Sequence, residues 1–202
     1  MKLARLTADK DWLPGSMYGG NHLYEVYAPK YGDNLVNHQA EVFPFGQAIA
    51  WEPGEQKFIK PYQTAKIFTG KVFTEMKWND FVQYSLENPR TPLLNKDALV
   101  QASPPQNIKK EARLWIVGGQ IVEAVYYRFN DDEPFEATVA PAGIEFAREM
   151  TATFSVAEAF VMDVCLTSQG WKIVEINCIK SAVLYPNTNV KSLVNALNFY
   201  FS

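Results

Sequence analysis

Two apolar runs separated by a short polar loop stand out late in the sequence. Residues 160–167 and 171–176 are rich in strand-forming side chains, and Ser168-Gln169-Gly170 lies between them. This pattern predicts a β-hairpin whose three-residue loop ends on a glycine in the left-handed region. The resulting opposed pairs are Thr167 with Trp171, Cys165 with Ile173, Asp163 with Glu175, and Val161 with Asn177.

The polar residues of this hairpin fall on one face. Side chains alternate along a strand and opposed residues share a face, so Asp163, Glu175 and Asn177 project together. Two opposed acids repel each other unless a cation joins them, and carboxylate and amide oxygens suit Mg²⁺. The hairpin therefore predicts half of a Mg-nucleotide site. The alternative is a solvated polar face. The opposite face predicts a core layer formed by Phe160, Met162, Val164, Val174 and Ile176.

A second hairpin is predicted around Gly118-Gly119. Residues 111–118 and 120–128 are strand-forming runs, and two glycines between such runs are typical of a two-residue hairpin loop. The resulting opposed pairs include Val117 with Gln120 and Arg113 with Ala124.

Arg113 is the unusual residue of the second hairpin. It alternates with Trp115 and Val117 on a mostly apolar face. A buried arginine needs an anionic partner. That partner is either a phosphate group or one of the acids Glu111 and Glu175.

Shorter patterns predict the remaining elements. Helical spacing is present at 76–88, at 141–151 after a proline, and at 189–201, where Asn187 or Thr188 caps the helix. Gly70 allows its strand to pass close to a ligand. The further strands expected from strand-forming runs are 24–27, 57–61, 67–73 and 97–102.

Composition narrows the class of protein. The 202 residues are 48% apolar and 20% charged with a net charge of −3, as expected for one or two soluble domains without a nucleic-acid surface. No apolar run approaches the roughly 20 residues of a membrane helix. Cys165 and Cys178 are expected to be reduced thiols of a cytoplasmic protein. With His22 and His38 as the only histidines, no zinc site is expected.

Several ordered motifs resemble one known superfamily. They are FIKP at 58–61, KIFTG at 66–70, E-x-R-x-W-I-V at 111–117, the strand aspartate Asp163, and Glu-x-Asn at 175–177. In this order they resemble the ATP-grasp superfamily over about residues 57–200. They are most similar to a branch of phages and bacteria that is marked by one arginine and two lysines.

The resemblance implies an α+β fold. Two small subdomains with antiparallel sheets would grip the nucleotide, after a reduced N-terminal region at 1–56. The ATP-grasp domain would span 57–202. Its lysine-bearing subdomain would be about 57–102, and its metal-binding subdomain about 103–202.

The resemblance also implies roles for individual residues. Lys60, Lys66 and Arg113 would bind the ATP phosphates and act in catalysis. The backbone of Gln101 and Ala102 would contact adenine. The Mg²⁺ ligands would be Asp163, Glu175 and Asn177.

The implied activity is that of an ATP- and Mg²⁺-dependent ligase. Such enzymes join a carboxylate to an amine or thiol through an acyl phosphate. The substrate could be an amino acid, a peptide or a protein tail, and the protein could form a homo-oligomer. Two alternatives remain open. One is a nucleotide-binding or inactive ATP-grasp-like protein that acts by protein interaction. The other is a structural protein without a ligand.

Overall fold

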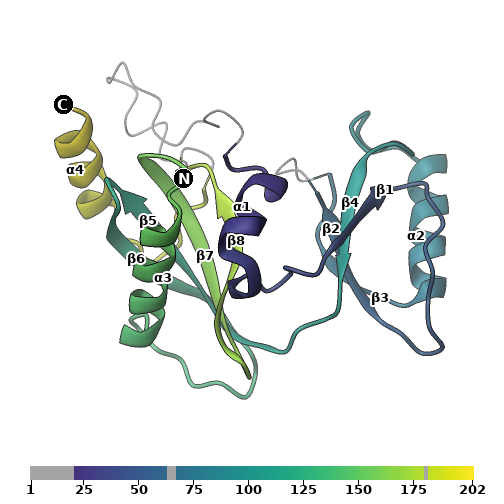
Figure 1. Ribbon diagram of the computed structural model, residues 1–202, viewed down its shortest axis with the longest axis horizontal. Coiled ribbons are helices and arrows are strands. Elements are labelled where there is room, and N and C mark those ends of the chain that lie inside the picture. Colours follow the sequence, from purple (N-terminus) through teal and green to yellow (C-terminus); the bar gives the residue numbers. More distant parts are fainter. Residues whose placement is uncertain (1–20, 63–66, 180–181) are drawn as a thin grey trace. The chain divides into compact units, whose positions relative to one another are not determined.

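The computed structural model describes residues 21–62, 67–179 and 182–202 (Figure 1). The chain forms two compact units, each built on a four-stranded sheet. Residues 37–106 form the smaller unit. The larger unit combines the segment that ends at Val36 with residues 107–202. The sequence-based division at residues 56 and 102 therefore differs from the observed one, in which an early segment joins the later part of the chain.

The smaller unit is an antiparallel sheet with one helix. Its strands are β1 (Glu41–Pro44), β2 (Lys57–Pro61), β3 (Lys71–Phe73) and β4 (Leu99–Ser103), in the order β1-β4-β2-β3. Helix α2 (Glu75–Glu87) runs along one face of this sheet (Figure 1). Trp78 of α2 is buried against Phe43, Phe45 and Phe73, and these aromatic contacts form the core of the unit.

The sequence predicted most of this unit. The strand predicted at 57–61 matches β2, and α2 matches the predicted helix to within one residue at each end. The predicted strand at 67–73 is shorter and retains only its last three residues as β3. Strand β1 was not predicted. It pairs with β4, so this sheet extends further toward the N-terminus than residue 57.

The larger unit is a longer antiparallel sheet with three helices. Its strands are β5 (Ile108–Val117), β6 (Gln120–Phe129), β7 (Ala159–Thr167) and β8 (Gly170–Asn177), in the order β6-β5-β7-β8. The helices are α1 (Tyr24–Tyr31), α3 (Pro141–Thr153) and α4 (Val190–Phe201), with a 3₁₀ turn, η2 (Gly32–Asn34), after α1. Within residues 21–62, 67–179 and 182–202, no helix is long and apolar enough to cross a bilayer.

Helix α4 covers the apolar half of one sheet face. Leu193 and Leu197 are fully buried in a cluster with Trp115, Val117 and Val161. The hydrophobic spacing of the last helix predicted this stripe. Asn189 caps the helix, because its side chain accepts a hydrogen bond from the backbone N–H of Ser192. The predicted caps Asn187 and Thr188 were therefore wrong by one or two residues.

Residues 24–31 form a helix, so the prediction of a short strand at 24–27 was wrong. Tyr24, Tyr27 and Tyr31 are spaced three and four residues apart, which brings them to one side of a helix. All three are buried. The hydroxyl of Tyr31 donates to the carbonyl of Phe154 at the end of α3. Burial against α3 decided the conformation of this segment.

The β7–β8 hairpin has the predicted pair of Asp163 with Glu175, although its loop differs from the predicted loop. Thr167 pairs with Gly170, so the loop has two residues rather than three, and Cys165 pairs with Lys172 rather than Ile173. A β-bulge between Asp163 and the next residue then shifts the register. As a result Asp163 lies opposite Glu175, as predicted. The bulge compensates for the shorter loop.

Bulges also shift the β5–β6 hairpin. Val117 pairs with Gln120 as predicted, but Arg113 pairs with Val125 rather than Ala124. One shift falls after Trp115, and a second leaves Tyr127 as the extra residue of β6. Sequence periodicity does not mark a bulge, because the pattern of apolar residues continues through it.

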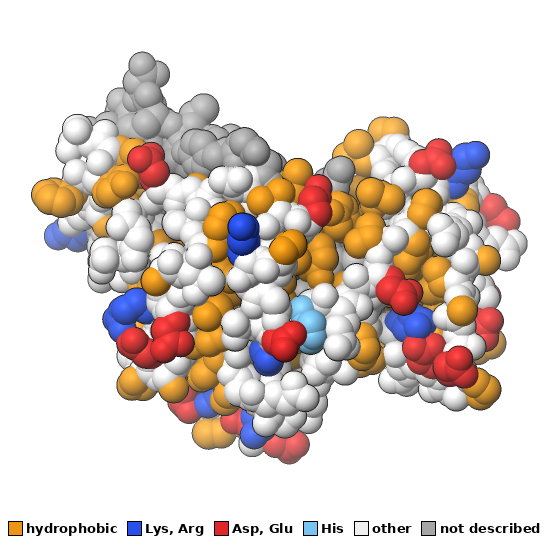
Figure 2. All heavy atoms as spheres, in the orientation of Figure 1, with side chains coloured by type: hydrophobic (Ala, Val, Ile, Leu, Met, Phe, Trp, Pro, Cys, Tyr) orange, Lys and Arg blue, Asp and Glu red, His pale blue; other side chains and the backbone are white. Residues whose placement is uncertain are grey.

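Charges of both signs are mixed on the surface. On the face drawn in Figure 2, acidic and basic side chains are interspersed among uncharged ones. This distribution agrees with the small net charge of −3.

Candidate functional site

A row of charged side chains crosses three strands of the larger sheet. Arg113 of β5 lies opposite Asp163 of β7, and Asp163 lies opposite Glu175 of β8. Opposed residues share a face, so all three project from the same side as Trp115. The row begins where the cluster under α4 ends. Burying one cation and two acids in a row within a sheet costs desolvation free energy, and a purely structural role does not explain that cost.

Arg113 and Asp163 form a buried bidentate ion pair. Nε of Arg113 donates to Oδ1 of Asp163 at 2.8 Å, and Nη2 donates to Oδ2 at 2.6 Å. Only 6% of Arg113 and 1% of Asp163 are exposed. The predicted alternatives for Arg113 were a phosphate or a salt bridge to Glu111 or Glu175. In the structure its partner is Asp163, the directly opposed residue.

The electrostatics of this pair reflect strong desolvation. Burial raises the pKa of Asp163 to about 6, and the neighbouring charge of Glu175 adds to the rise. The hydrogen bonds and charge of Arg113 act against it. Burial would lower the pKa of Arg113, but its bonds to Asp163 raise that pKa above the ordinary value. The guanidinium therefore keeps its charge at all accessible pH values.

Asn177 joins the two acids. Its Nδ2 donates to Oε1 of Glu175 at 2.7 Å and to Oδ2 of Asp163 at 3.3 Å. The three residues predicted as metal ligands are therefore brought together at one end of the hairpin. Two carboxylates and an amide are an oxygen donor set that suits Mg²⁺. In the described part of the chain, no group of three His, Cys, Asp or Glu residues could hold a metal ion.

Two tyrosines whose pairing the sequence did not predict lie beside Arg113. The rings of Tyr127 and Tyr185 are stacked, with centroids 4.9 Å apart and planes 9° apart. Cζ of Arg113 lies 5.7 Å from the Tyr127 centroid and 5.3 Å from that of Tyr185, within cation–π range. Nη1 of Arg113 donates to the carbonyl of Val183 at 3.3 Å. A tyrosine on β6 and another beyond β8 meet only in the folded chain, so no sequence pattern marks this stack.

Glu111 occupies the next position along the same face. It is 6% exposed and accepts from the Tyr127 hydroxyl at 2.6 Å and from Nη1 of Arg128 at 2.5 Å. Both carboxylate oxygens of Glu111 are therefore bound. Glu111 is part of the motif that contains Arg113, but its role is to anchor β6 rather than to pair with the arginine.

Lys60 belongs to the smaller unit. It lies on β2, opposite Gln101 of β4. Gly70 passes close to it: a Cβ atom at Gly70 would lie 2.7 Å from Cβ of Lys60 and 2.9 Å from Cζ of Phe58. The glycine predicted to pass close to a ligand thus makes room for the stem of Lys60. Lys66 lies outside the described residues, so its predicted role stays a prediction.

Gln101 and Ala102, the residues predicted to contact adenine, belong to the smaller unit. Both lie on β4, an interior strand, and each pairs with β1 on one side and β2 on the other. The side chain of Gln101 is buried and accepts from Nδ2 of Asn37. The predicted contact of these two residues with adenine stays a prediction.

One family model accounts for nearly the whole chain. The ATP-grasp domain, R2K clade family 3, matches residues 9–197. No curated protein matches the sequence.

Solved structures resemble this chain at low sequence identity. The ATP-grasp ligase PsnB, complexed with its minimal precursor, has a TM-score of 0.57 at 12% identity, over 90% of this chain and 61% of PsnB. The D-alanine–D-alanine ligase from Bacillus anthracis has a TM-score of 0.57 at 11% identity, over 87% of this chain and 61% of that ligase. The D-cycloserine synthetase DcsG has a TM-score of 0.57 at 11% identity, with 90% and 71% covered.

These likenesses establish the fold. The chain spans about three fifths of PsnB and of the Bacillus anthracis ligase. The α+β ATP-grasp fold that the motifs predicted is confirmed by the family match and by these structures.

Proposed function

We propose, because the chain belongs to the ATP-grasp domains of R2K clade family 3, that it is an ATP- and Mg²⁺-dependent ligase. The proposed reaction joins a carboxylate to an amine or thiol. The observation that carries the proposal is the buried row of Arg113, Asp163 and Glu175 with Asn177 beside it. The proposal is supported because a guanidinium suits phosphate oxygens, the neighbouring carboxylates and amide suit Mg²⁺, and a sheet does not need such a row to hold together.

The residues of the row have different proposed roles in binding Mg²⁺ and phosphate. Asp163, Glu175 and the amide oxygen of Asn177 would hold Mg²⁺, which supplies charge neutralisation at the ATP phosphates. Arg113 presents a planar fork of N–H donors that matches phosphate oxygens. Phosphate binding would replace its two hydrogen bonds to Asp163, whose oxygens are then open to the metal. The ion pair thus keeps both groups ionised and in place before ligands arrive.

The proposed ligase reaction has two steps. An oxygen of the substrate carboxylate attacks the γ-phosphorus of ATP, and the bond to the β–γ bridging oxygen breaks, so that ADP leaves. The amine or thiol then attacks the acyl carbon, and inorganic phosphate leaves with the electron pair of the C–O bond. The proton of the nucleophile passes to solvent or phosphate. In such a reaction the protein mainly positions reactants and stabilises charge.

Two lysines complete the proposed phosphate contacts. Lys60 has a side chain whose stem is fixed by the close approach of Gly70. Lys66 begins the next motif, KIFTG. Compact ammonium groups would neutralise charge on the transferred phosphoryl group without competing for metal sites.

The carboxylate substrate is proposed to be an amino acid, a peptide or a protein tail. PsnB is described in complex with a precursor peptide, and the second ligase is named for D-alanine. A cytoplasmic location, where ATP and Mg²⁺ are available, fits this activity.

Thermal unfolding with nucleotide tests the proposal. We expect ATP or ADP with Mg²⁺ to raise the melting temperature of the protein, because a ligand at 100 times its Kd stabilises the native state by about 2.7 kcal/mol. Glu175→Gln should lose the Mg²⁺-dependent part of the rise. Glu149→Gln, an exposed acid of α3, is the matched control and should keep it.

Turnover separates a ligase from a binding protein. ADP release with candidate carboxylates, and trapping of the acyl phosphate with hydroxylamine, would be measured for wild type and Asp163→Asn. We expect release in the wild type and none in Asp163→Asn. Nucleotide binding without release for any carboxylate would assign the chain a binding role instead. If nucleotide did not change the melting temperature of the wild type, both the ligase and the nucleotide-binding hypotheses would be rejected.

A further inference from the structure

The Arg113 guanidinium is held by more than its acid partner. Asp163 accepts two of its hydrogen bonds and the Val183 carbonyl accepts a third. The stacked rings of Tyr127 and Tyr185 lie against it within 6 Å. A single ion pair with Asp163 does not require this second set of contacts.

We propose that Tyr127 and Tyr185 are positioning residues that hold Arg113 in place for the phosphates of the nucleotide. This inference rests on the proposed function and extends it to two residues that would not touch substrate themselves. The rings set the orientation of the guanidinium, and the guanidinium contacts the phosphate.

The rings matter most once ligands arrive. When Mg²⁺ and phosphate engage Asp163 and Arg113, the two hydrogen bonds between these residues are exchanged for bonds to ligand. A guanidinium on a flexible stem would then be free to rotate. Contacts with aromatic rings use no N–H donor, so they persist while the N–H groups that bound Asp163 turn to phosphate. A side chain that is already oriented loses less entropy on binding.

Tyr185 is fixed by a turn. Its backbone N–H donates to Oγ1 of Thr188 at 3.1 Å, and the N–H of Thr188 donates to the Tyr185 carbonyl at 3.0 Å. Pro186 further restricts the backbone of Tyr185. Asn189 then caps α4 directly after the turn. The ring is thus tied to a buried helix rather than to a free loop.

Tyr127 is fixed by a bulge and a buried acid. It is the extra residue of β6, and a bulge can re-aim a side chain next to a site. Its hydroxyl donates to Glu111, whose other oxygen is held by Arg128. Burial raises the pKa of Tyr127 above its ordinary value, with the charges of Asp163 and Glu111 adding to the rise. The phenol therefore remains a neutral donor.

A purely structural role for the stack predicts a different result. If the rings only filled space, their loss would lower stability and weaken all nucleotides alike. Positioning of Arg113 predicts a loss confined to the phosphates that this residue contacts. The ratio of ATP affinity to AMP affinity separates the two, because AMP carries the adenine and ribose without the β- and γ-phosphates.

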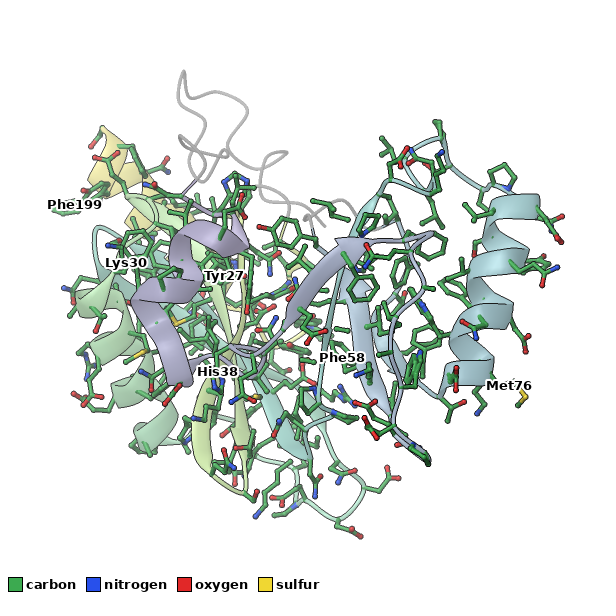
Figure 3. All side chains as sticks on the ribbon, turned by 45° about the vertical axis from the view of Figure 1, so that its right-hand side comes forward. Tyr27, Lys30, His38, Phe58, Met76 and Phe199 are labelled. Carbon is green, nitrogen blue, oxygen red and sulfur yellow. The ribbon has the colours of Figure 1, made fainter. Side chains whose placement is uncertain are left out.

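The experiment compares three single variants with the wild type. Tyr185→Leu removes the ring, and Tyr185→Phe keeps it. Phe199→Leu is the control, because Phe199 is 87% exposed and projects outward from α4 (Figure 3). Isothermal titration would give the Kd of ATP with Mg²⁺ and that of AMP for each protein, and urea denaturation would give its stability.

We expect Tyr185→Leu to bind ATP with Mg²⁺ about tenfold more weakly and AMP as the wild type does, in line with loss of a partly desolvated cation–π contact. Tyr185→Phe and Phe199→Leu should keep the wild-type ratio of affinities. Unchanged ATP affinity in Tyr185→Leu, or equal losses for ATP and AMP, would overturn the inference. A wild type that binds no nucleotide would instead reject the proposed function on which it rests.

Discussion

The Arg113–Asp163 pair offers a quantitative test of the structure. We consider Arg113→Met, which keeps much of the apolar stem and removes the charge. Asp163 would then be left almost fully buried beside Glu175, with Asn177 as its remaining neutral donor. Removing one partner of a buried pair typically costs about 3–5 kcal/mol, because the other charge stays buried and uncompensated. That cost is a large part of the 5–15 kcal/mol by which a domain is usually stable.

A double-mutant cycle isolates the interaction. Asp163→Asn alone leaves the guanidinium unpaired and should also destabilise the protein. The double variant buries neither charge, so we expect it to be about 2–3 kcal/mol more stable than the sum of the two single effects. The free energies would come from urea denaturation followed by circular dichroism, with EDTA present to remove divalent ions.

The exposed pair of Arg148 and Glu145 is the matched control. Both side chains are more than half exposed, and they lie three residues apart on α3. Exposed pairs contribute little, so the cycle of Arg148→Met with Glu145→Gln should be additive within error. An additive cycle at Arg113 and Asp163 as well, or a cost below about 1 kcal/mol for Arg113→Met, would refute the reasoning from burial.

Three further predictions concern stability and reactivity. Burial raises the pKa of Cys165 to about 12, so its thiol should resist iodoacetamide in the native protein at pH 8 and react in urea, as mass spectrometry would show; labelling of the native protein would contradict this. Gly70→Ala should lower stability by about 1–3 kcal/mol through overlap with Lys60, measured by urea denaturation; no loss would contradict the close approach. Asn189→Ala should cost about 1 kcal/mol and Asn187→Ala nearly nothing, and equal effects would reject Asn189 as the cap.

The sequence alone predicted both hairpins of the larger sheet, the later helices and the shared face of Asp163, Glu175 and Asn177. Alternation placed Asp163, Glu175 and Asn177 on one face, and the strong signal of Gly118-Gly119 gave the second hairpin with its loop. Such features are local, because they depend on turn residues and on a period of two along each strand. The ordered motifs added the fold, which the family match confirms.

The folded chain decided what depends on contacts distant in sequence. Bulges shifted both hairpin registers, and the pairing of Asp163 with Glu175 survived only because a bulge compensated for a shorter loop. The place of β4 between β1 and β2 was likewise decided by the folded chain, because no single strand's sequence encodes the order of strands in a sheet.

The partners of Arg113 show most clearly that contacts between distant residues cannot be predicted from local sequence patterns. The sequence indicated that a buried arginine needs an anion, which is a matter of solvation energy and holds wherever the residue lies. Its actual partner, Asp163, is 50 residues away along the chain. Tyr127 and Tyr185 come from two further segments and meet beside it. Only tertiary packing brings these four side chains together, because each belongs to a different strand or loop and no local pattern links them.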